Sequence, residues 1–272
     1  MKLAPILICA LSVINAGTCM AEPETGKAKV QWLTVSPGYQ AGVPLQAAIS
    51  MRLEDGWHTY WENPGEAGMQ MKVMWQLPAG WKAGELEYPS PTRFTTSGLT
   101  SYGYKGTVVF PVLLYPPAEA TGPVELKAKL SWLVCNDDSC LPGSAEVILN
   151  LISAPFTVSD ASAMIEENLK KIPRQTTSDI SLTVSEEAME LHLALAVKDT
   201  VNFSPLDYEA FPATPQVVDE AAKYEWVFSE EQRLWQVTLP KSEYVTEAVK
   251  ELELVFVGKG AQAPVRVNWK IR

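Results

Sequence analysis

The chain has 272 residues, of which 47% are apolar and 20% are charged, and its formal net charge is −10. This composition excludes a disordered chain, and the acidity excludes a nucleic-acid binder that relies on a basic surface. The length accommodates about two domains with real cores, which excludes a small disulfide-dense scaffold. The 20 prolines and 16 glycines favour a turn-rich, β-rich architecture over a helical bundle.

The first 21 residues have the pattern of a secretory signal peptide. Lys2 supplies a positive charge, residues 3–16 are mostly apolar but too short to span a bilayer, and Ala21 is a small residue suited to cleavage. We predict cleavage after Ala21; an uncleaved N-terminal anchor is the alternative. Cleavage leaves Cys135 and Cys140 in an oxidising compartment, where nearby thiols can pair. Later apolar runs are shorter than a membrane span, so we expect no transmembrane segment in the mature chain.

Residues 22–157 are predicted to form a first domain, which contains six of the nine tryptophans. Apolar and polar residues alternate over residues 124–132 and again over 147–151, which is typical of half-buried strands. Pro-Gly pairs at 64–65 and 142–143 predict turns between strands. These patterns favour a β-sandwich.

Residues 158–173 have a different pattern, which predicts a linker helix of about three turns. Apolar residues recur at helical spacing, Ser159 or Asp160 can cap the first turn, and Pro173 ends the pattern. We therefore expect this helix to join two domains.

Residues 174–272 are predicted to form a second β-sandwich. Apolar and polar residues alternate over 180–184, 191–195 and 265–271. The predicted fold class is all-β, with two sandwiches joined by a short helix. Because the chain ends in the last of these strands, we expect no membrane domain.

Cys135 and Cys140 flank four residues, Asn-Asp-Asp-Ser, that suit the loop of a hairpin. Cysteines at the two ends of such a loop can approach within disulfide distance. Cys135 falls off the apolar face of the strand before it, and Cys140 falls off the apolar face of the strand after it. Both sulfurs are therefore expected to lie outside the main core, within reach of solvent.

Two other interpretations of the cysteine pair remain open. A stabilising staple is the commoner role of paired cysteines in secreted domains, although so short a loop contributes only about 2 kcal/mol. A metal site is the other, with Asp137 and Asp138 as additional ligands. Zinc would need four ligands, and the paired spacings of a zinc ribbon are absent, so we expect no metal.

Five segments together resemble the N-terminal periplasmic domain of the DsbD family of thiol:disulfide interchange proteins, especially its ScsB-like branch. The resemblance covers about residues 29–151, and it continues more faintly at Phe-Ser-Pro 203–205, which resembles part of a second sandwich domain in that branch. The matching segments are GWHTYWENPGEAG (56–68), WQLP with a following glycine (75–80), YPSPTRF (88–94), YGY (102–104) and WLVCNDDSCLPG (132–143).

The resemblance implies an immunoglobulin-like fold and a periplasmic location. It implies that Cys135 and Cys140 are a redox pair, cycling between dithiol and disulfide without a cofactor, as in a protein-disulfide reductase. The electrons would come from a thioredoxin-like or membrane thiol-disulfide relay and pass to oxidised periplasmic proteins. A link to cytochrome c-type biogenesis is implied as well. Family members usually continue into membrane helices and a thioredoxin-like domain, so we expect the donor to be a separate protein.

Four aromatic residues are candidates for a cap over the pair or for a surface that docks a partner. The resemblance implies a cap segment at residues 99–104, with Tyr102 as the lid residue and Tyr104 beside it. Trp57 and Trp61 are candidates for docking; the alternative for them is core and edge packing of the sandwich.

The loop between the cysteines carries Asp137 and Asp138, whose negative charges are expected to raise the pKa of the thiols. We therefore predict that at least one thiol of the reduced protein has a pKa at or above the free value of about 8.5. Arg93, Lys105 or His58 are the cations or bases that could approach in space. The alternative function is a secreted, non-enzymatic binding or scaffold protein with an inert disulfide.

Overall fold

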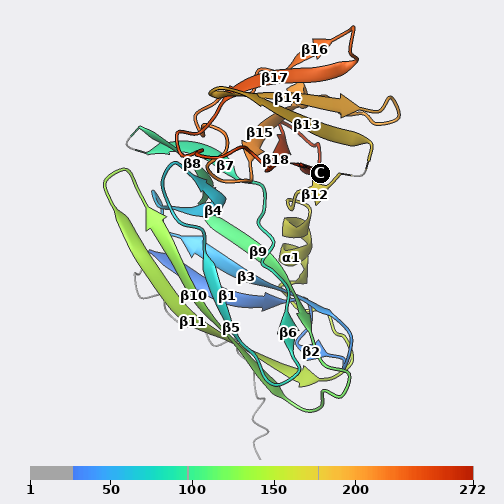
Figure 1. Ribbon diagram of the computed structural model, residues 1–272. Coiled ribbons are helices and arrows are strands. Elements are labelled where there is room, and N and C mark those ends of the chain that lie inside the picture. Colours follow the sequence, from blue (N-terminus) through green and yellow to red (C-terminus); the bar gives the residue numbers. More distant parts are fainter. Residues whose placement is uncertain (1–26, 97, 177, 272) are drawn as a thin grey trace, which may run out of the picture.

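The computed structural model describes residues 27–96, 98–176 and 178–271. The predicted signal peptide, with Cys9 and Cys19, lies outside the described residues. Figure 1 shows two layered β regions, one coloured blue to yellow-green and the other gold to red, with a short helix beside their junction. The all-β, immunoglobulin-like fold class predicted from the sequence is confirmed.

The first region contains two sheets that face one another across its core. One sheet has the strand order β1-β3-β9-β6, and the other has the order β2-β11-β10-β4-β8-β7, with β5 also paired to β10. The strands are β1 (Ala28–Thr34), β2 (Gly38–Tyr39), β3 (Leu45–Leu53), β4 (His58–Gly65), β5 (Lys72–Gln76), β6 (Lys82–Ala83), β7 (Thr92–Thr96), β8 (Leu99–Lys105), β9 (Thr107–Tyr115), β10 (Val124–Cys135) and β11 (Cys140–Ser153).

Alternating residues of these strands supply the core between the two sheets. Along β10, Leu126, Ala128, Leu130 and Trp132 are buried, as the alternation of residues 124–132 predicts. The indole nitrogen of Trp32 on β1 donates a hydrogen bond of 3.2 Å to the carbonyl of Val147 on β11, which ties the two sheets together.

The second region contains two sheets of four strands each. Their strand orders are β12-β19-β18-β15 and β13-β14-β17-β16. The strands are β12 (Arg174–Gln175), β13 (Ile180–Glu187), β14 (Glu190–Val197), β15 (Tyr208–Pro212), β16 (Val227–Ser229), β17 (Leu234–Pro240), β18 (Glu251–Gly258) and β19 (Val265–Lys270), and a single 3-10 turn covers Pro205–Asp207. Strands lie at all three alternating segments predicted in this region. The boundaries proposed for the two domains, at residues 157 and 174, stay predictions.

The linker helix is shorter than the sequence pattern predicts. Helix α1 spans Ser162–Leu169, and Ala161 at its N-cap position makes no side-chain capping hydrogen bond. Ser159, an expected cap, instead donates its hydroxyl hydrogen bond to the carbonyl of Thr34 on β1. Ile165 is fully buried and packs on β3 and β9. The helix is therefore held by contacts with the sheet and has no side-chain cap.

The turn predicted at residues 142–143 is wrong, because β11 runs through it without a break. Its pairing with β10 is continuous from Cys140 opposite Cys135 to Leu151 opposite Val124. Pro142 lacks an N–H, which is tolerated here because the described pairing partners of β11 at this point lie on one side only. The pair at 64–65 forms the last two residues of β4, where the pairing of β4 with β8 has shifted register.

Gly143 is required by the side chain opposite it. A Cβ atom at this position would lie 2.4 Å from Nε1 of the fully buried Trp132. We expect Gly143→Ala to lower the free energy of unfolding by about 1–3 kcal/mol, the usual cost of overpacking a core. Urea unfolding followed by tryptophan fluorescence measures this. The neighbouring Ser144→Ala is the control, with an expected change below about 0.5 kcal/mol; equal effects of the two substitutions would contradict the steric explanation.

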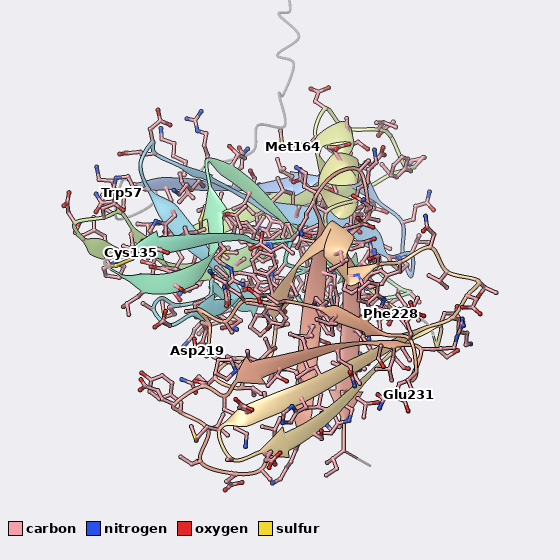
Figure 2. The ribbon with its side chains drawn as sticks, turned by 90° about the horizontal axis from the view of Figure 1, so that it is seen from above. Trp57, Cys135, Met164, Asp219, Phe228 and Glu231 are labelled. Carbon is pink, nitrogen blue, oxygen red and sulfur yellow. A yellow bond between two sulfur atoms is a disulfide. The ribbon has the colours of Figure 1, made fainter. Side chains whose placement is uncertain are left out.

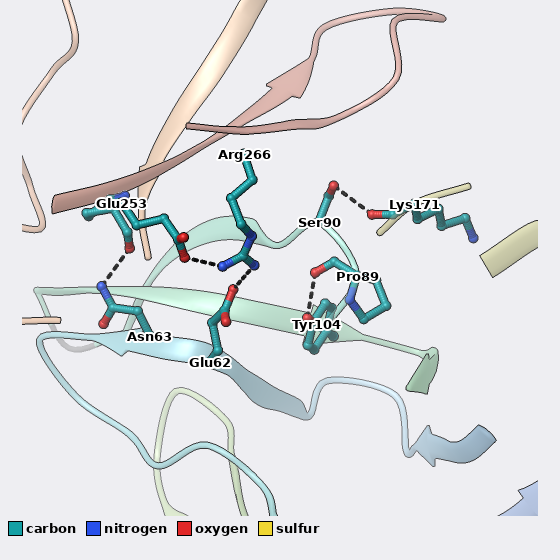
Figure 3. A network of polar contacts seen from close by, with 9 residues as sticks. Glu62, Asn63, Pro89, Ser90, Tyr104, Lys171, Glu253 and Arg266 are labelled. Atoms are coloured by element: carbon teal, nitrogen blue, oxygen red, sulfur yellow. Dashed lines mark hydrogen bonds and ion pairs between the residues drawn. The ribbon is translucent and has the colours of Figure 1, made fainter. Parts of the chain in front are cut away.

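The two regions share a polar and aromatic interface. The guanidinium of Arg93 on β7 donates to the main-chain carbonyls of Glu220 at 2.6 Å and Ala210 at 3.3 Å. Arg266 on β19 forms ion pairs with Glu62 on β4 and with Glu253 on β18, as Figure 3 shows. These contacts connect the second region to β4, which pairs with β10 at Cys135, and to β7 of the same sheet.

Candidate functional site

The cysteine pair closes the hairpin between β10 and β11. Cys135 and Cys140 are directly opposite in the strand pairing, their Cα atoms are 4.1 Å apart, and their sulfurs form a disulfide. Within the loop, the side-chain oxygen of Asn136 accepts hydrogen bonds from the main-chain N–H groups of Asp138 at 3.0 Å and Ser139 at 2.8 Å. Asn136 also donates its main-chain N–H to the carbonyl of Ser139 at 2.9 Å. The hairpin predicted from the sequence is therefore present.

The two sulfurs differ in exposure, which the strand parity did not predict. Cys140 is exposed, whereas Cys135 has 0% of its surface exposed. The expectation that both sulfurs can be reached is therefore wrong for Cys135. The physical reason is that β4 pairs with β10 at this residue, so neighbouring side chains cover the face on which Cys135 lies.

Four residues form a row across four neighbouring strands at the disulfide. Cys140 pairs with Cys135, Cys135 pairs with His58 on β4, and His58 pairs with Lys105 on β8. Side chains of directly paired residues lie on the same face of a sheet. Phe94 of β7 packs against this row, with its ring centroid 4.3 Å from that of His58 and 5.8 Å from the Lys105 amine. The row places a histidine next to the buried Cys135 and a lysine on the far side of that histidine.

His58 is held neutral by its surroundings. Burial, and then the positive charge of Lys105, lower the pKa of His58 to about 4, while Asp137 acts in the opposite direction. Because the unfolded chain binds a proton on this histidine at higher pH than the folded protein does, this group makes the fold less stable as the pH falls from 6.5 toward 4. At neutral pH the imidazole carries no charge, and it can donate one hydrogen bond and accept another.

Asp137 and Asp138 are both exposed in the loop between the cysteines. Water screens such charges, so their effect on a thiol is modest, whereas burial raises the pKa of a thiol directly. The predicted thiol pKa at or above about 8.5 stays a prediction, and the structure adds burial of Cys135 as a second reason for it.

Of the four aromatic residues proposed for a cap or a docking surface, all except Trp57 are buried. Trp61 and Tyr102 have no exposed surface and Tyr104 has 7%, so these three do not form an exposed docking surface. The ring of Tyr102 packs against Phe211 of the second region, with centroids 5.5 Å apart. Tyr102 donates its hydroxyl hydrogen bond to Glu220, and Tyr104 donates to Pro89. The lid assignment of Tyr102 therefore conflicts with its place in the interface.

Trp57 is half-buried and lies at the end of the molecule that carries the disulfide (Figure 2). It follows the turn before β4, and the Lys27 amine lies 5.4 Å from its ring centroid. A docking role for Trp57 stays a prediction. Of the three cations or bases considered, Arg93 is committed to the second region, and His58 and Lys105 lie in the row with Cys135.

Phe94 is the neighbour of the site that the sequence did not single out. It lies two strands away from β4 in the sheet order, and its ring still reaches His58. The segment that contains it is part of the family resemblance, but its contact depends on the pairing of segments 36 positions apart. Among the described residues, no cluster of three or more histidine, cysteine, aspartate or glutamate side chains is arranged to hold a metal ion.

Comparisons with known proteins support the resemblance found in the sequence. Residues 29–152 match the family described as thiol:disulfide interchange protein DsbD, N-terminal. The crystal structure of the N-terminal periplasmic domain of ScsB from Proteus mirabilis superposes with a TM-score of 0.63 at 21% sequence identity, covering 90% of this chain and 93% of that one. This likeness shows a shared fold, and the predicted resemblance is confirmed.

A second solved structure is less similar to this chain. The sporulation control protein Spo0M from Bacillus subtilis matches with a TM-score of 0.24 at 10% identity, covering 90% of this chain and 91% of that one. No curated protein matches the chain by sequence. None of the described helices is long and apolar enough to cross a membrane.

Proposed function

We propose, from the premise that residues 29–152 are a DsbD-type N-terminal domain, that this protein exchanges thiols and disulfides through Cys135 and Cys140. The observation that carries the proposal is the asymmetry of the disulfide, with Cys140 exposed and Cys135 buried beside His58. An exposed sulfur admits an attacking thiolate, and a buried one leaves without reacting with other molecules.

The exchange proceeds in two steps. A thiolate of the donor attacks the Cys140 sulfur, the bond between the two cysteines breaks, and the electron pair stays on the Cys135 sulfur. A second donor thiolate then attacks the donor sulfur of this mixed disulfide and releases Cys140 as a thiolate. The donor leaves as a disulfide, and two protons from water convert the pair to a dithiol. An oxidised client is reduced by the same steps in reverse.

The proposed partners follow from the same family. A thioredoxin-like or membrane thiol-disulfide relay would be the donor, and oxidised periplasmic proteins would be the acceptors. A periplasmic location is supported by the family match and by the likeness to ScsB, whose matching part is a periplasmic domain. A contribution to cytochrome c-type biogenesis is part of this proposal.

A second candidate is a secreted binding or scaffold protein with an inert disulfide. The complete burial of Cys135 and the hydrogen-bonded loop around Asn136 favour it, because structural cysteines are buried and held rigidly. The two candidates differ in whether the disulfide opens while the protein stays folded.

The reduction potential of the folded protein separates them. We expect the disulfide to equilibrate with a glutathione or thioredoxin couple in buffer without denaturant, with a potential above about −300 mV, because structural disulfides lie below this value. The fraction of reduced protein is measured by trapping free thiols at each ratio of the couple, while tryptophan fluorescence reports that the fold is intact. A disulfide that stays closed until urea unfolds the protein would establish the scaffold role.

A further inference from the structure

His58, the cross-strand partner of Cys135, carries a buried nitrogen atom without a hydrogen-bond partner among the described residues. His58 is directly opposite Cys135 in the strand pairing, and the Cβ atoms of such pairs are typically about 5 Å apart. The His58 side chain is 2% exposed, and its Nε2 atom has no hydrogen-bond partner among the described residues. An unpaired buried nitrogen costs free energy. A partner that appears when the disulfide opens would remove that cost.

The groups that face the imidazole come from four elements. Lys105 lies across from it on β8, Asp137 is in the loop after β10, Tyr60 is on β4 itself and Phe94 is on β7. The imidazole is neutral near pH 7, so it carries one N–H that it can donate. The aromatic rings of Tyr60 and Phe94 hold it in place without using this N–H in the described contacts.

We propose that the Nε2–H of His58 donates a hydrogen bond to the sulfur of Cys135 when that sulfur becomes a thiolate. This rests on the proposed thiol-disulfide exchange and assigns a residue to it. In the disulfide form the sulfur is uncharged and accepts hydrogen bonds weakly, which agrees with the unpartnered nitrogen. In the opened form the sulfur carries a full negative charge without access to water, and a hydrogen bond to it is correspondingly strong. Lys105, next in the row, adds a favourable charge.

The step balances without a proton transfer. A donor thiolate bonds to the Cys140 sulfur as the disulfide breaks, and both bonding electrons go to Cys135. His58 keeps its proton throughout and only shares it with the new thiolate. The negative charge that arrives with the donor thiolate therefore ends on Cys135, where His58 stabilises it. The leaving sulfur departs faster because its thiol pKa is lower.

The test is His58→Phe, which removes the N–H and keeps an aromatic ring against Phe94. We expect the pKa of the Cys135 thiol, measured by thiolate absorbance in a Cys140→Ser background, to rise by about one unit. Reduction of the otherwise unsubstituted disulfide by glutathione is expected to slow about three- to tenfold. His58→Gln retains an N–H donor and is expected to recover part of both effects. His192→Phe, at the only other histidine, is the control and is expected to change neither.

Unchanged thiol pKa and reduction rate in His58→Phe would overturn the proposal while leaving exchange by the wild type intact. If the wild-type disulfide does not react at all, the exchange function itself fails, which is a separate result. A measurement on the wild type covers the case in which His58→Phe does not fold. In an NMR spectrum of protons bound to nitrogen, the Nε2 proton of His58 is expected to shift downfield when the protein is reduced at a pH where Cys135 is ionised. An unchanged proton resonance would refute the hydrogen bond.

Discussion

We expect the Cys135→Ala variant to accumulate a mixed disulfide with its redox partner, and the Cys140→Ala variant to accumulate almost none. The first variant keeps the exposed sulfur and loses the one that would resolve the intermediate. The second keeps a sulfur with no exposed surface, which reacts only during local opening of the structure. An opening free energy of about 3 kcal/mol corresponds to a rate about a hundredfold lower.

The asymmetry is measured in two ways. Non-reducing electrophoresis of extracts from cells that express each variant shows the mixed disulfide in vivo. Alkylation of each purified, reduced variant gives the rate of its single remaining thiol in vitro, and alkylation in urea is the control that should equalise the two rates. Similar alkylation rates for the two folded variants would show that Cys135 is as accessible as Cys140. This result would contradict the proposal that the donor attacks Cys140 first.

Arg266→Ala is expected to lower the free energy of unfolding by about 2–4 kcal/mol. The guanidinium lies between Glu62 of the first region and Glu253 of the second, and its side chain is 18% exposed. Removing one partner of a largely buried ion pair leaves the other charges unpaired. The two carboxylates would then face one another across the interface shown in Figure 3. Thermal or urea unfolding at pH 7 measures the loss.

The deficit of the Arg266→Ala variant should depend on pH. Burial raises the pKa of Glu62 above its ordinary value of 4.5, and Arg266 counteracts this rise. Without Arg266 the folded protein holds a proton on Glu62 up to a still higher pH, so in that window it binds more protons than the unfolded chain. Stability of the variant relative to wild type therefore increases as the pH falls toward 4.5, and the deficit is largest at neutral pH.

Lys270→Ala provides a matched control on the same strand. Lys270 pairs with Glu251 at 2.9 Å, but the two side chains are 73% and 59% exposed. Its loss is expected to cost about 0.5 kcal/mol or less, because solvent screens an exposed pair. Two outcomes would contradict the proposal that ion pairs stabilise this interface. One is an equal loss of unfolding free energy in the two variants, and the other is a deficit of Arg266→Ala that grows as the pH falls.

The sequence predicted most reliably the features that depend on residues close together in the chain, namely strands and a hairpin loop. Alternation over residues 124–132 and 147–151 identified two strands, and the four residues between Cys135 and Cys140 were enough to place both sulfurs at one hairpin. A two-residue periodicity reports which face of a strand is apolar, and a short loop leaves little freedom for its ends. The resemblance to the DsbD N-terminal family rested on such local segments.

Predictions failed where long-range contacts override a local signal. The Pro-Gly pair at 142–143 is typical of a turn, yet pairing with β10 carries β11 straight through it. Ser159 is a good helix cap by type, yet its hydroxyl bonds to Thr34 on a strand 125 positions earlier. In each case the local conformational preference contributes less free energy than the long-range contacts that oppose it.

The sequence by itself therefore determined the all-β class, the cysteine hairpin and the family resemblance. Only the tertiary structure decided which sulfur is exposed and which groups surround it. Cys135 is covered because His58, which lies 77 positions earlier in the chain, becomes its cross-strand partner. Strand register between distant segments is a property of the assembled sheet, and shifting it by one residue would send these side chains to opposite faces. The reactivity proposed for the pair depends on that register.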